Sequence, residues 1–220
     1  MERLQDLFLD TLEQTLPLKG SRVLEIGCGD GARAVEIARR SRFVTGIDPS
    51  PKHIRIAQNR GIRNAVFQRI LAEGMQFPRG HVDTVMFSLS LHHIKVQKMA
   101  KAITRAACAA AGTARKKSGF IVFLEPGTKG SLFEAELKFD AWDGDERRQK
   151  EAAYEAMESH PDIERFAKEI PDETIIRFES VADFKSWVHP KKNLGDIEPF
   201  LEEHQYTLNA QRRIHIFRVR

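Results

Sequence analysis

Hydrophobic positions alternate between two patterns from about residue 22 to residue 124. Short apolar runs of strand length are each followed by a segment in which apolar residues recur at helical spacing. Strands that alternate with helices indicate a parallel sheet covered on both faces, which is an α/β fold. The predicted strands lie at residues 22–26, 43–47, 65–67, 82–89 and 119–124, and the predicted helices at residues 32–40, 51–59 and 94–111.

The two ends of the chain follow other patterns. Leucine and phenylalanine recur at helical spacing near the start, which predicts a helix within residues 1–18. Residues 128–172 are rich in charge and predict a helical insertion after the fifth strand. We expect a single domain over residues 1–220, with its core at residues 20–127. Residues 173–220 would complete the sheet through a strand at 173–178, helices at 181–188 and 196–204, and a terminal β-hairpin at 206–219.

The charge is distributed unevenly. Residues 1–130 hold 21 basic and 11 acidic side chains, whereas residues 131–173 hold 6 basic and 14 acidic ones. A basic pI alone would suggest nucleic acid, but the acidic block would border the active site and repel phosphate. We therefore expect a neutral or cationic small-molecule partner and no nucleic acid.

Composition excludes several other classes of protein. No apolar run approaches the roughly 20 residues that a membrane span needs. The two cysteines, Cys28 and Cys108, are too few and too far apart for a disulfide framework, which favours the cytoplasm. Zinc-ligand spacing is also absent from the sequence, so we expect no metal site.

The clearest chemical signal is the segment VLEIGCGDG at residues 23–31. It places a glycine-rich turn directly after a predicted strand and before a predicted helix. Glycines let the backbone approach a ligand closely, and ligands bind at the carboxyl ends of such strands. Gly27, Gly29 and Ala32 also satisfy the spacing of nicotinamide-dinucleotide enzymes, so the turn alone leaves the ligand open.

The neighbouring residues narrow the choice. Glu25 precedes Gly27 by two positions, and the resulting E-x-G-x-G-x-G pattern resembles motif I of the class I S-adenosylmethionine-dependent methyltransferases. Asp48 ends the second strand, where that family places an acid for the ribose hydroxyls. Residues 72–78, 82–85, 90–94 and 124–127 are similar to later landmarks of its small-molecule branch, which includes quinone and sterol methyltransferases. This combination, over residues 20–127, disfavours a nicotinamide-dependent oxidoreductase.

The resemblance implies a Rossmann-like, mostly parallel seven-stranded sheet with an antiparallel last strand and helices on both faces. It also implies S-adenosyl-L-methionine as cofactor and transfer of its methyl group to a small-molecule acceptor. Gly27, Gly29 and Gly31 would shape the pocket around the methionine moiety, and Asp48 would bind the ribose. The full set of implied cofactor residues is Glu25, Gly27, Cys28, Gly29, Asp48, Pro49, Ala72, Glu73, Ser88 and His92.

Fewer residues are candidates for the chemistry itself. His93 and Glu125 follow predicted strands at the ligand edge, and either could take a proton from the acceptor. His92 and His93 are adjacent, and adjacent residues on a regular element point apart, which argues against a metal pair. Phe133, Phe139 and Trp142 belong to the predicted insertion and are candidates for a lid over the substrate.

One position departs from the family pattern. The branch usually has an acid before Ala72-Glu73 that contacts the adenine amino group, and here that position is Leu71. The loss of one hydrogen bond would cost about 0.5–1.5 kcal/mol. This departure keeps a non-catalytic partner subunit open as an alternative. An RNA or protein methyltransferase is the other alternative, although Ser88-Leu89-Ser90-Leu91 replaces the Asn/Asp-Pro-Pro-aromatic turn typical of amino methylation of nucleic-acid bases.

Overall fold

The computed structural model describes residues 1–114, 117–142 and 144–220. Its strands are β1 (Glu2–Asp6), β2 (Arg22–Ile26), β3 (Phe43–Asp48), β4 (Ala65–Arg69), β5 (Thr84–Ser88), β6 (Phe120–Pro126), β7 (Ile163–Arg165), β8 (Ile170–Arg177) and β9 (Thr207–Val219). Its α-helices are α1 (Phe8–Glu13), α2 (Ala32–Arg40), α3 (Pro51–Asn59), α4 (Val96–Ala110), α5 (Ser131–Phe139), α6 (Arg147–Glu158), α7 (Val181–Val188) and α8 (Ile197–Glu203), with 3₁₀ turns η1 (Ala72–Gly74) and η2 (Leu194–Asp196).

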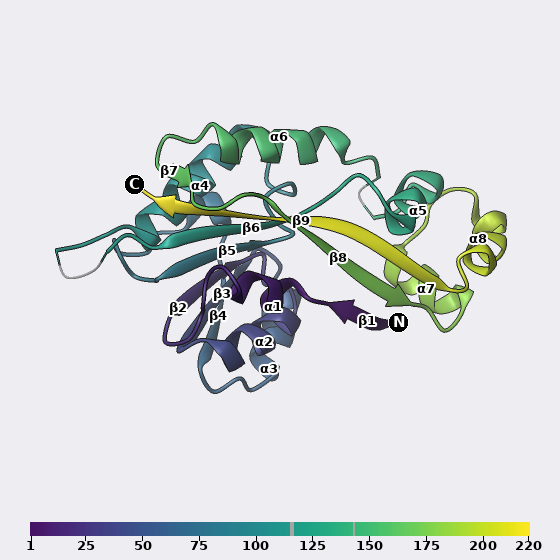
Figure 1. Cartoon of the computed structure of the whole chain (residues 1–220). Helices are drawn as coiled ribbons and strands as arrows, with labels where there is room; N and C mark the ends of the chain where they lie inside the picture. Colours follow the sequence, from purple (N-terminus) through teal and green to yellow (C-terminus); the bar gives the residue numbers. More distant parts are fainter. Residues whose placement is uncertain (115–116, 143) are drawn as a thin grey trace.

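All these strands belong to one sheet, in the order β1-β8-β9-β6-β5-β2-β3-β4, with β7 also paired to β9 (Figure 1). The central strands β2 to β6 pair in parallel, because each is joined to the next through a helix or a long connection. The chain order reverses at β2, which has β3 on one side and β5 on the other. Such a reversal opens a crevice at the carboxyl ends of the strands.

Helices cover both faces of the parallel part of the sheet (Figure 1). Helices α1, α2 and α3 pack on one face, where Phe8, Leu12, Ile37 and Ile54 are buried. Helices α4 and α6 pack on the other face. Helices α5, α7 and α8 form a third apolar cluster with the far end of β8 and β9. This arrangement confirms the predicted α/β class with helices on both faces.

The sheet has nine strands in the described part of the chain, where seven were predicted. One addition is β1, which pairs antiparallel with β8. The predicted N-terminal helix was therefore too long, since only Phe8–Glu13 is α-helical within residues 1–18. Leu4 and Leu7 are exposed and do not contribute to an apolar helix face. Backbone pairing to the sheet edge outweighs the helical spacing there.

The predicted terminal hairpin is also wrong, because β9 is one continuous strand. It pairs with β8 on one side and with β6 on the other, antiparallel to both. Polar residues in the middle of β9 are held inside the sheet by partners: Asn209 accepts from Ser131, and Arg212 Nε donates to Asp172 Oδ2 at 2.6 Å. A satisfied polar residue needs no turn.

The segment predicted as a helical insertion is helical only in part. Helices α5 and α6 lie in it, but its last third forms β7 and the start of β8. Residue 143 of this segment is outside the described residues. The added strand β7 pairs with the end of β9, so the segment belongs to the same sheet as the core.

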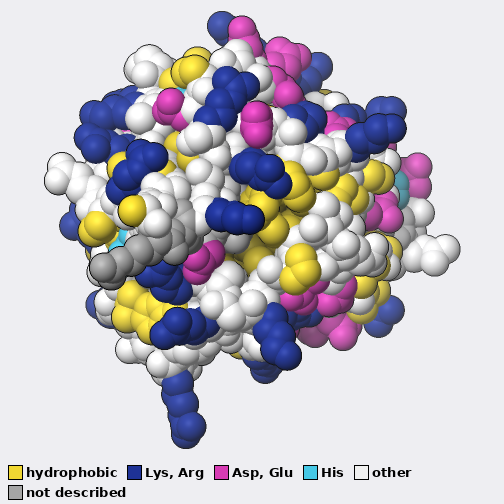
Figure 2. Space-filling view, turned by 60° about the vertical axis from the view of Figure 1, so that its left-hand side comes forward, with side chains coloured by type: hydrophobic (Ala, Val, Ile, Leu, Met, Phe, Trp, Pro, Cys, Tyr) yellow, Lys and Arg dark blue, Asp and Glu magenta, His cyan; other side chains and the backbone are white. Residues whose placement is uncertain are grey.

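Surface charge and helix length are the two features that relate to binding of nucleic acid or a membrane. Figure 2 shows Lys and Arg side chains spread over one face, interrupted by acidic and hydrophobic groups rather than gathered into one patch. Within the described ranges, every helix is too short or too polar to traverse a bilayer.

Candidate active site

A cavity of about 700 Å³ opens at the carboxyl ends of β2, β3, β4 and β5, where the strand order reverses. Its position is that expected for a ligand of a doubly wound sheet. We call it the first cavity. Its lining residues come from the turns after these strands: Ile26, Gly27, Gly29, Ile47, Asp48, Pro49, Ser50, His53, Ile70, Leu71, Ala72, Glu73, Leu89, Ser90, His93, Ile94, Lys95 and Lys98.

Two glycines of the turn after β2 serve different purposes. Gly27 has φ +73°, and a Cβ there would lie 2.4 Å from Cβ of Ser90, so no side chain fits. Gly29 has φ +53°, but a Cβ there would meet no atom of the described residues within 4 Å. Gly27 is therefore required for packing of the turn, whereas Gly29 leaves open space beside the cavity.

Asp48 joins the two loops at the cavity floor. Its Oδ2 accepts from the backbone N–H of Gly29 at 3.0 Å, and its Oδ1 accepts from that of Ser50 at 2.8 Å. The side chain is buried yet lines the cavity. His53 Nδ1 also lies 3.4 Å from Oδ1, whereas Oδ2 has a second lone pair with which Asp48 can accept from a ligand hydroxyl.

Glu25 lies beneath the same turn and is 1 % exposed. Within the described residues its two carboxylate oxygens meet no partner in good hydrogen-bond geometry. Burial raises the pKa of Glu25 to about 7, although the charge of Arg33 and the nearby Ser88 hydroxyl oppose the shift. An unpaired buried carboxylate is costly, and a cationic ligand nearby would offset this cost. Cys28 is buried in the same turn, and burial raises the pKa of its thiol.

The wall made by β4 and η1 is apolar apart from one ion pair. Ile70, Leu71 and Ala72 line it, and Leu71 is 54 % exposed. Glu73 accepts from Lys98 Nζ at 2.8 Å, and this hydrogen bond lowers the pKa of Glu73. Such a wall suits a flat aromatic ring system whose polar edge reaches backbone groups.

A second cavity of about 430 Å³ adjoins the first. Leu89 and His93 line both cavities, so they form the boundary between them. The second cavity is assembled from β1, the turns after β5 and β6, helices α5 and α6, and the strands β8 and β9. Its other lining residues are Arg3, His92, Pro126, Gly127, Lys129, Leu132, Phe133, Glu136, Trp142, Glu146, Lys150, Thr174, Ile176, Trp187, Ala210, Gln211 and Arg212.

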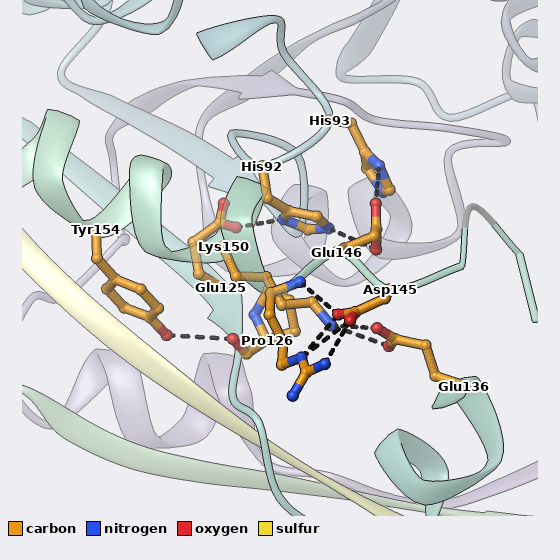
Figure 3. A network of polar contacts seen from close by, with 10 residues as sticks. His92, His93, Glu125, Pro126, Glu136, Asp145, Glu146, Lys150 and Tyr154 are labelled. Carbon is orange, nitrogen blue, oxygen red and sulfur yellow. Dashed lines mark hydrogen bonds and ion pairs between the residues drawn. The ribbon is translucent and has the colours of Figure 1, made fainter. Parts of the chain in front are cut away.

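Two histidines and two glutamates meet at this boundary (Figure 3). His92 Nδ1 bonds to Glu125 Oε2, and the other Glu125 oxygen accepts from the Leu91 backbone N–H at 2.9 Å. His92 Nε2 lies 4.0 Å from Glu146 Oε2, and His93 Nδ1 lies 3.2 Å from Glu146 Oε1. Burial alone would raise the pKa of Glu146. The hydrogen bond with His93 and nearby positive charges outweigh burial, so the pKa lies below its ordinary value.

The expectation that the two imidazoles point apart is wrong. Their ring centroids are 4.1 Å apart. The backbone N–H of Ile94 donates to the Leu91 carbonyl at 3.0 Å, so His92 and His93 are the central residues of a tight turn. Side chains alternate only on an extended strand, and a turn can place neighbours side by side.

A buried ion pair forms another wall of the second cavity. Lys150 Nζ donates to both carboxylate oxygens of Glu136 at 2.8 and 2.9 Å, and it lies 5.0 Å from the centre of the Phe133 ring. Trp142 Nε1 donates to the backbone carbonyl of Trp187 at 2.9 Å. Of the predicted lid residues, Phe133 and Trp142 line this cavity, whereas Phe139 is buried in the cluster around α7 and α8.

The structure places the other predicted site residues as follows. The first cavity is lined by Gly27, Gly29, Asp48, Pro49, Ala72, Glu73 and His93. Glu25, Cys28, Ser88 and Glu125 are buried behind the cavity walls, and His92 lines only the second cavity. Sequence reasoning missed Glu146, Glu136 and Lys150, because no local motif links them to the turn after β5. It also missed Ile70, whose strand-end position was the available signal.

Part of the predicted cofactor-binding core is similar to known proteins. Residues 23–111 match the family model of the methyltransferase domain. The same part is 37 % identical over 86 residues to an uncharacterized methyltransferase of Mycobacterium tuberculosis, covering 38 % of this chain and 43 % of that protein. It is 33 % identical over 98 residues to a protein of Ralstonia nicotianae named ubiquinone biosynthesis O-methyltransferase, covering 43 % of this chain and 41 % of that protein. The chain thus spans less than half the length of these relatives.

Solved structures resemble the whole chain. The YcgJ protein of Bacillus subtilis has a TM-score of 0.64 at 15 % identity and covers 96 % of both chains. The N-methyltransferase NodS of Bradyrhizobium japonicum, solved with S-adenosyl-L-homocysteine, has a TM-score of 0.55 at 15 % identity, covering 96 % of this chain and 84 % of that one. At such identities the likeness concerns the fold, and it extends beyond residues 23–111 to both ends of the sheet.

Proposed function

We propose that this chain, whose residues 23–111 match the family model of the methyltransferase domain, is a class I S-adenosylmethionine-dependent methyltransferase that transfers a methyl group to a small-molecule acceptor. The observation that carries the proposal is the pair of cavities that meet at Leu89 and His93. A donor in one and an acceptor in the other would face each other across these two residues. Holding two reactants in line is the main contribution that such an enzyme makes.

The first cavity fits the cofactor. Asp48 would accept from the ribose hydroxyls, the apolar wall at Ile70 and Leu71 would pack against the adenine, and the turn at Gly27–Gly29 would hold the methionine moiety. The unpaired carboxylate of Glu25 would be compensated by the cofactor's ammonium group, directly or through water. When bound, the cofactor supplies a methyl group already activated by its sulfonium.

The second cavity would hold the acceptor. Its volume lies within the range of small-molecule sites. The relative named as an O-methyltransferase supports an oxygen atom as the acceptor. The acceptor lone pair would bond to the methyl carbon as the carbon–sulfur bond breaks with its electrons left on sulfur, and a hydroxyl acceptor would pass its proton to His93. His92 and His93 line the second cavity and would contact this atom, and Glu125, which bonds to His92, would act through it as a positioning residue.

Calorimetric titration with S-adenosylmethionine, S-adenosylhomocysteine and NADH tests the cofactor. We expect micromolar binding of the two adenosyl compounds and none of NADH. Incubation with methyl-labelled cofactor and separate pools of small phenols, RNA and protein then tests the acceptor. Label in RNA or protein alone would contradict a small acceptor, and tight cofactor binding without label in any pool would favour a non-catalytic subunit.

A further inference from the structure

The group at the boundary of the two cavities has the composition of a metal site. One ligand atom each from His92, His93 and Glu146 lies within 4.8 Å of the others. Two imidazoles and one carboxylate are a ligand set used for Zn²⁺ and other first-row transition metals. We infer that these three side chains bind a divalent transition-metal ion, with its open positions toward the second cavity.

The distances permit a common ion. Ligand atoms about 2.1 Å from one metal lie at most about 4.2 Å apart. The Glu146 oxygens lie 3.2 Å from His93 Nδ1 and 4.0 Å from His92 Nε2, so both pairs are already within this span. The ring nitrogens of His92 and His93 lie within 4.8 Å of each other, as all three ligand atoms do, so a small rotation of the half-exposed His93 ring would bring the whole set onto one ion.

Glu125 supplies the second feature of a metal site. It is 1 % exposed and bonds to His92 Nδ1 (Figure 3). A carboxylate that holds one ring nitrogen fixes the tautomer, so that the other nitrogen presents its lone pair. Metal-binding histidines nearly always have such an outer partner. His92 Nε2 is the atom left facing Glu146.

The surrounding charge also favours a cation. Glu125 and Glu146 flank His92 on opposite sides, so two carboxylates converge on the imidazole pair. Lys150, a cation whose charge acts on Glu146, is neutralised by both oxygens of Glu136. A bound divalent ion would balance the converging carboxylates without displacing this ion pair.

The coordination positions of the metal that the protein leaves open indicate which class of small molecule would bind there. Because His92, His93 and Glu146 all line the second cavity, the remaining positions would be filled by a small molecule there. A hydroxyl or carboxylate oxygen is the fitting donor, and coordination lowers the pKa of a hydroxyl. This acceptor part of the inference rests on the proposed function, whereas the metal site itself does not.

Metal binding can be measured without any substrate. The full chain, stripped with a chelator, is titrated calorimetrically with Zn²⁺, and Co²⁺ binding is followed by its visible absorption. We expect one ion per chain, bound more tightly than about 10 μM. Glu146→Gln should weaken Zn²⁺ binding at least tenfold, and Glu125→Gln about 10- to 100-fold through the outer partner.

The matched control is Glu151→Gln, the same substitution at an exposed position of the neighbouring helix α6. It should bind Zn²⁺ as the unmodified chain does. S-adenosylhomocysteine titration and thermal melting report whether Glu146→Gln is folded. Absence of a single Zn²⁺ site, or a site equally strong in Glu146→Gln, would overturn the inference. Methyl transfer that persists fully with chelator would refute the metal's role while leaving the proposed function intact.

Discussion

The two cavities differ in how the chain builds them. The first is made by short turns that follow four neighbouring strands, and its floor is held by backbone donors to Asp48. The second is made by side chains from both ends and the middle of the chain, including the ion pair of Lys150 with Glu136. Substitutions that add atoms should damage a site built from backbone geometry. Substitutions that leave one charge without its partner should damage a site built from buried ion pairs.

The largest expected effect concerns the buried ion pair. Glu136→Leu would leave the Lys150 ammonium, 2 % exposed, without its partner, which should lower the free energy of unfolding by about 3–5 kcal/mol. Urea unfolding measures this loss. The double variant Glu136→Leu/Lys150→Met removes both charges and should recover most of it. A double variant as unstable as the single one would show that packing, not charge, is responsible.

The corresponding change in the first cavity is Gly27→Ala. The added Cβ would meet Ser90 in a left-handed backbone, and we expect a loss of about 2–4 kcal/mol in the free energy of unfolding. Gly29→Ala has the same strain but no clash, so its loss should be near 1 kcal/mol. Thermal melting compares the two variants. Equal losses would mean that contact with Ser90 is unimportant.

Glu25 gives a pH-dependent test of the first cavity. Its folded pKa of about 7 exceeds the ordinary value of 4.5, so the protonated form is favoured by folding. The stability gained from this proton is complete below pH 4.5 and is lost as the pH rises through 7. The loss is about 3 kcal/mol. Glu25→Gln cannot titrate, so the stability difference between the two proteins should shift by this amount between pH 4.5 and 8. Parallel pH profiles in urea unfolding would contradict the assignment.

Asp48→Ala tests whether the carboxylate at the floor of the first cavity binds the cofactor. We expect S-adenosylhomocysteine binding to weaken by about 1.5–3 kcal/mol, or roughly 10- to 150-fold, through lost ribose contacts. Asp30→Ala, which removes a half-buried acid paired with Arg60 in the turn after β2 but outside the cavity lining, is the matched control. Calorimetry should show it near the unmodified affinity. An unchanged affinity in Asp48→Ala would place the ribose elsewhere.

The smallest expected effect is a gain. Leu71→Asp restores the acid that the methyltransferase resemblance leads one to expect, at a position already 54 % exposed. One added hydrogen bond to the adenine amino group should tighten S-adenosylhomocysteine binding by about 0.5–1.5 kcal/mol. Leu71→Asn is the uncharged control. Weaker binding in Leu71→Asp would show that the apolar wall holds the adenine by packing.

The difference between the two cavities also explains which parts of the site could be predicted from the sequence. The turn at Gly27–Gly29 and the acid at Asp48 are local: a few adjacent residues determine both backbone and site. The second cavity depends on pairs such as Arg212 with Asp6, which lie at opposite ends of the chain. Periodicity carries no information on such pairings. It also misread β1 and β9, because hydrogen bonding to a neighbouring strand decides their structure.

The turn that contains His92 and His93 could be predicted only in part. Adjacent histidines at residues 92 and 93 were visible, but their relation depended on a turn that hydrophobic periodicity does not detect. Glu146 joins them from another helix start, 53 residues later. Chemistry-bearing residues could therefore be found one at a time, whereas their combination required the fold.

The shared boundary of Leu89 and His93 has a thermodynamic consequence. Leu89 has φ +54° and lines both cavities, so a molecule in either cavity presses on the same side chain. A displacement of Leu89 by a molecule in one cavity would change the affinity of the other cavity, and linkage makes this coupling reciprocal: the factor by which a cofactor changes acceptor affinity equals the factor by which the acceptor changes cofactor affinity. Compounds that fill only the second cavity can thus be discovered through their effect on a cofactor titration, before any methylated product is known.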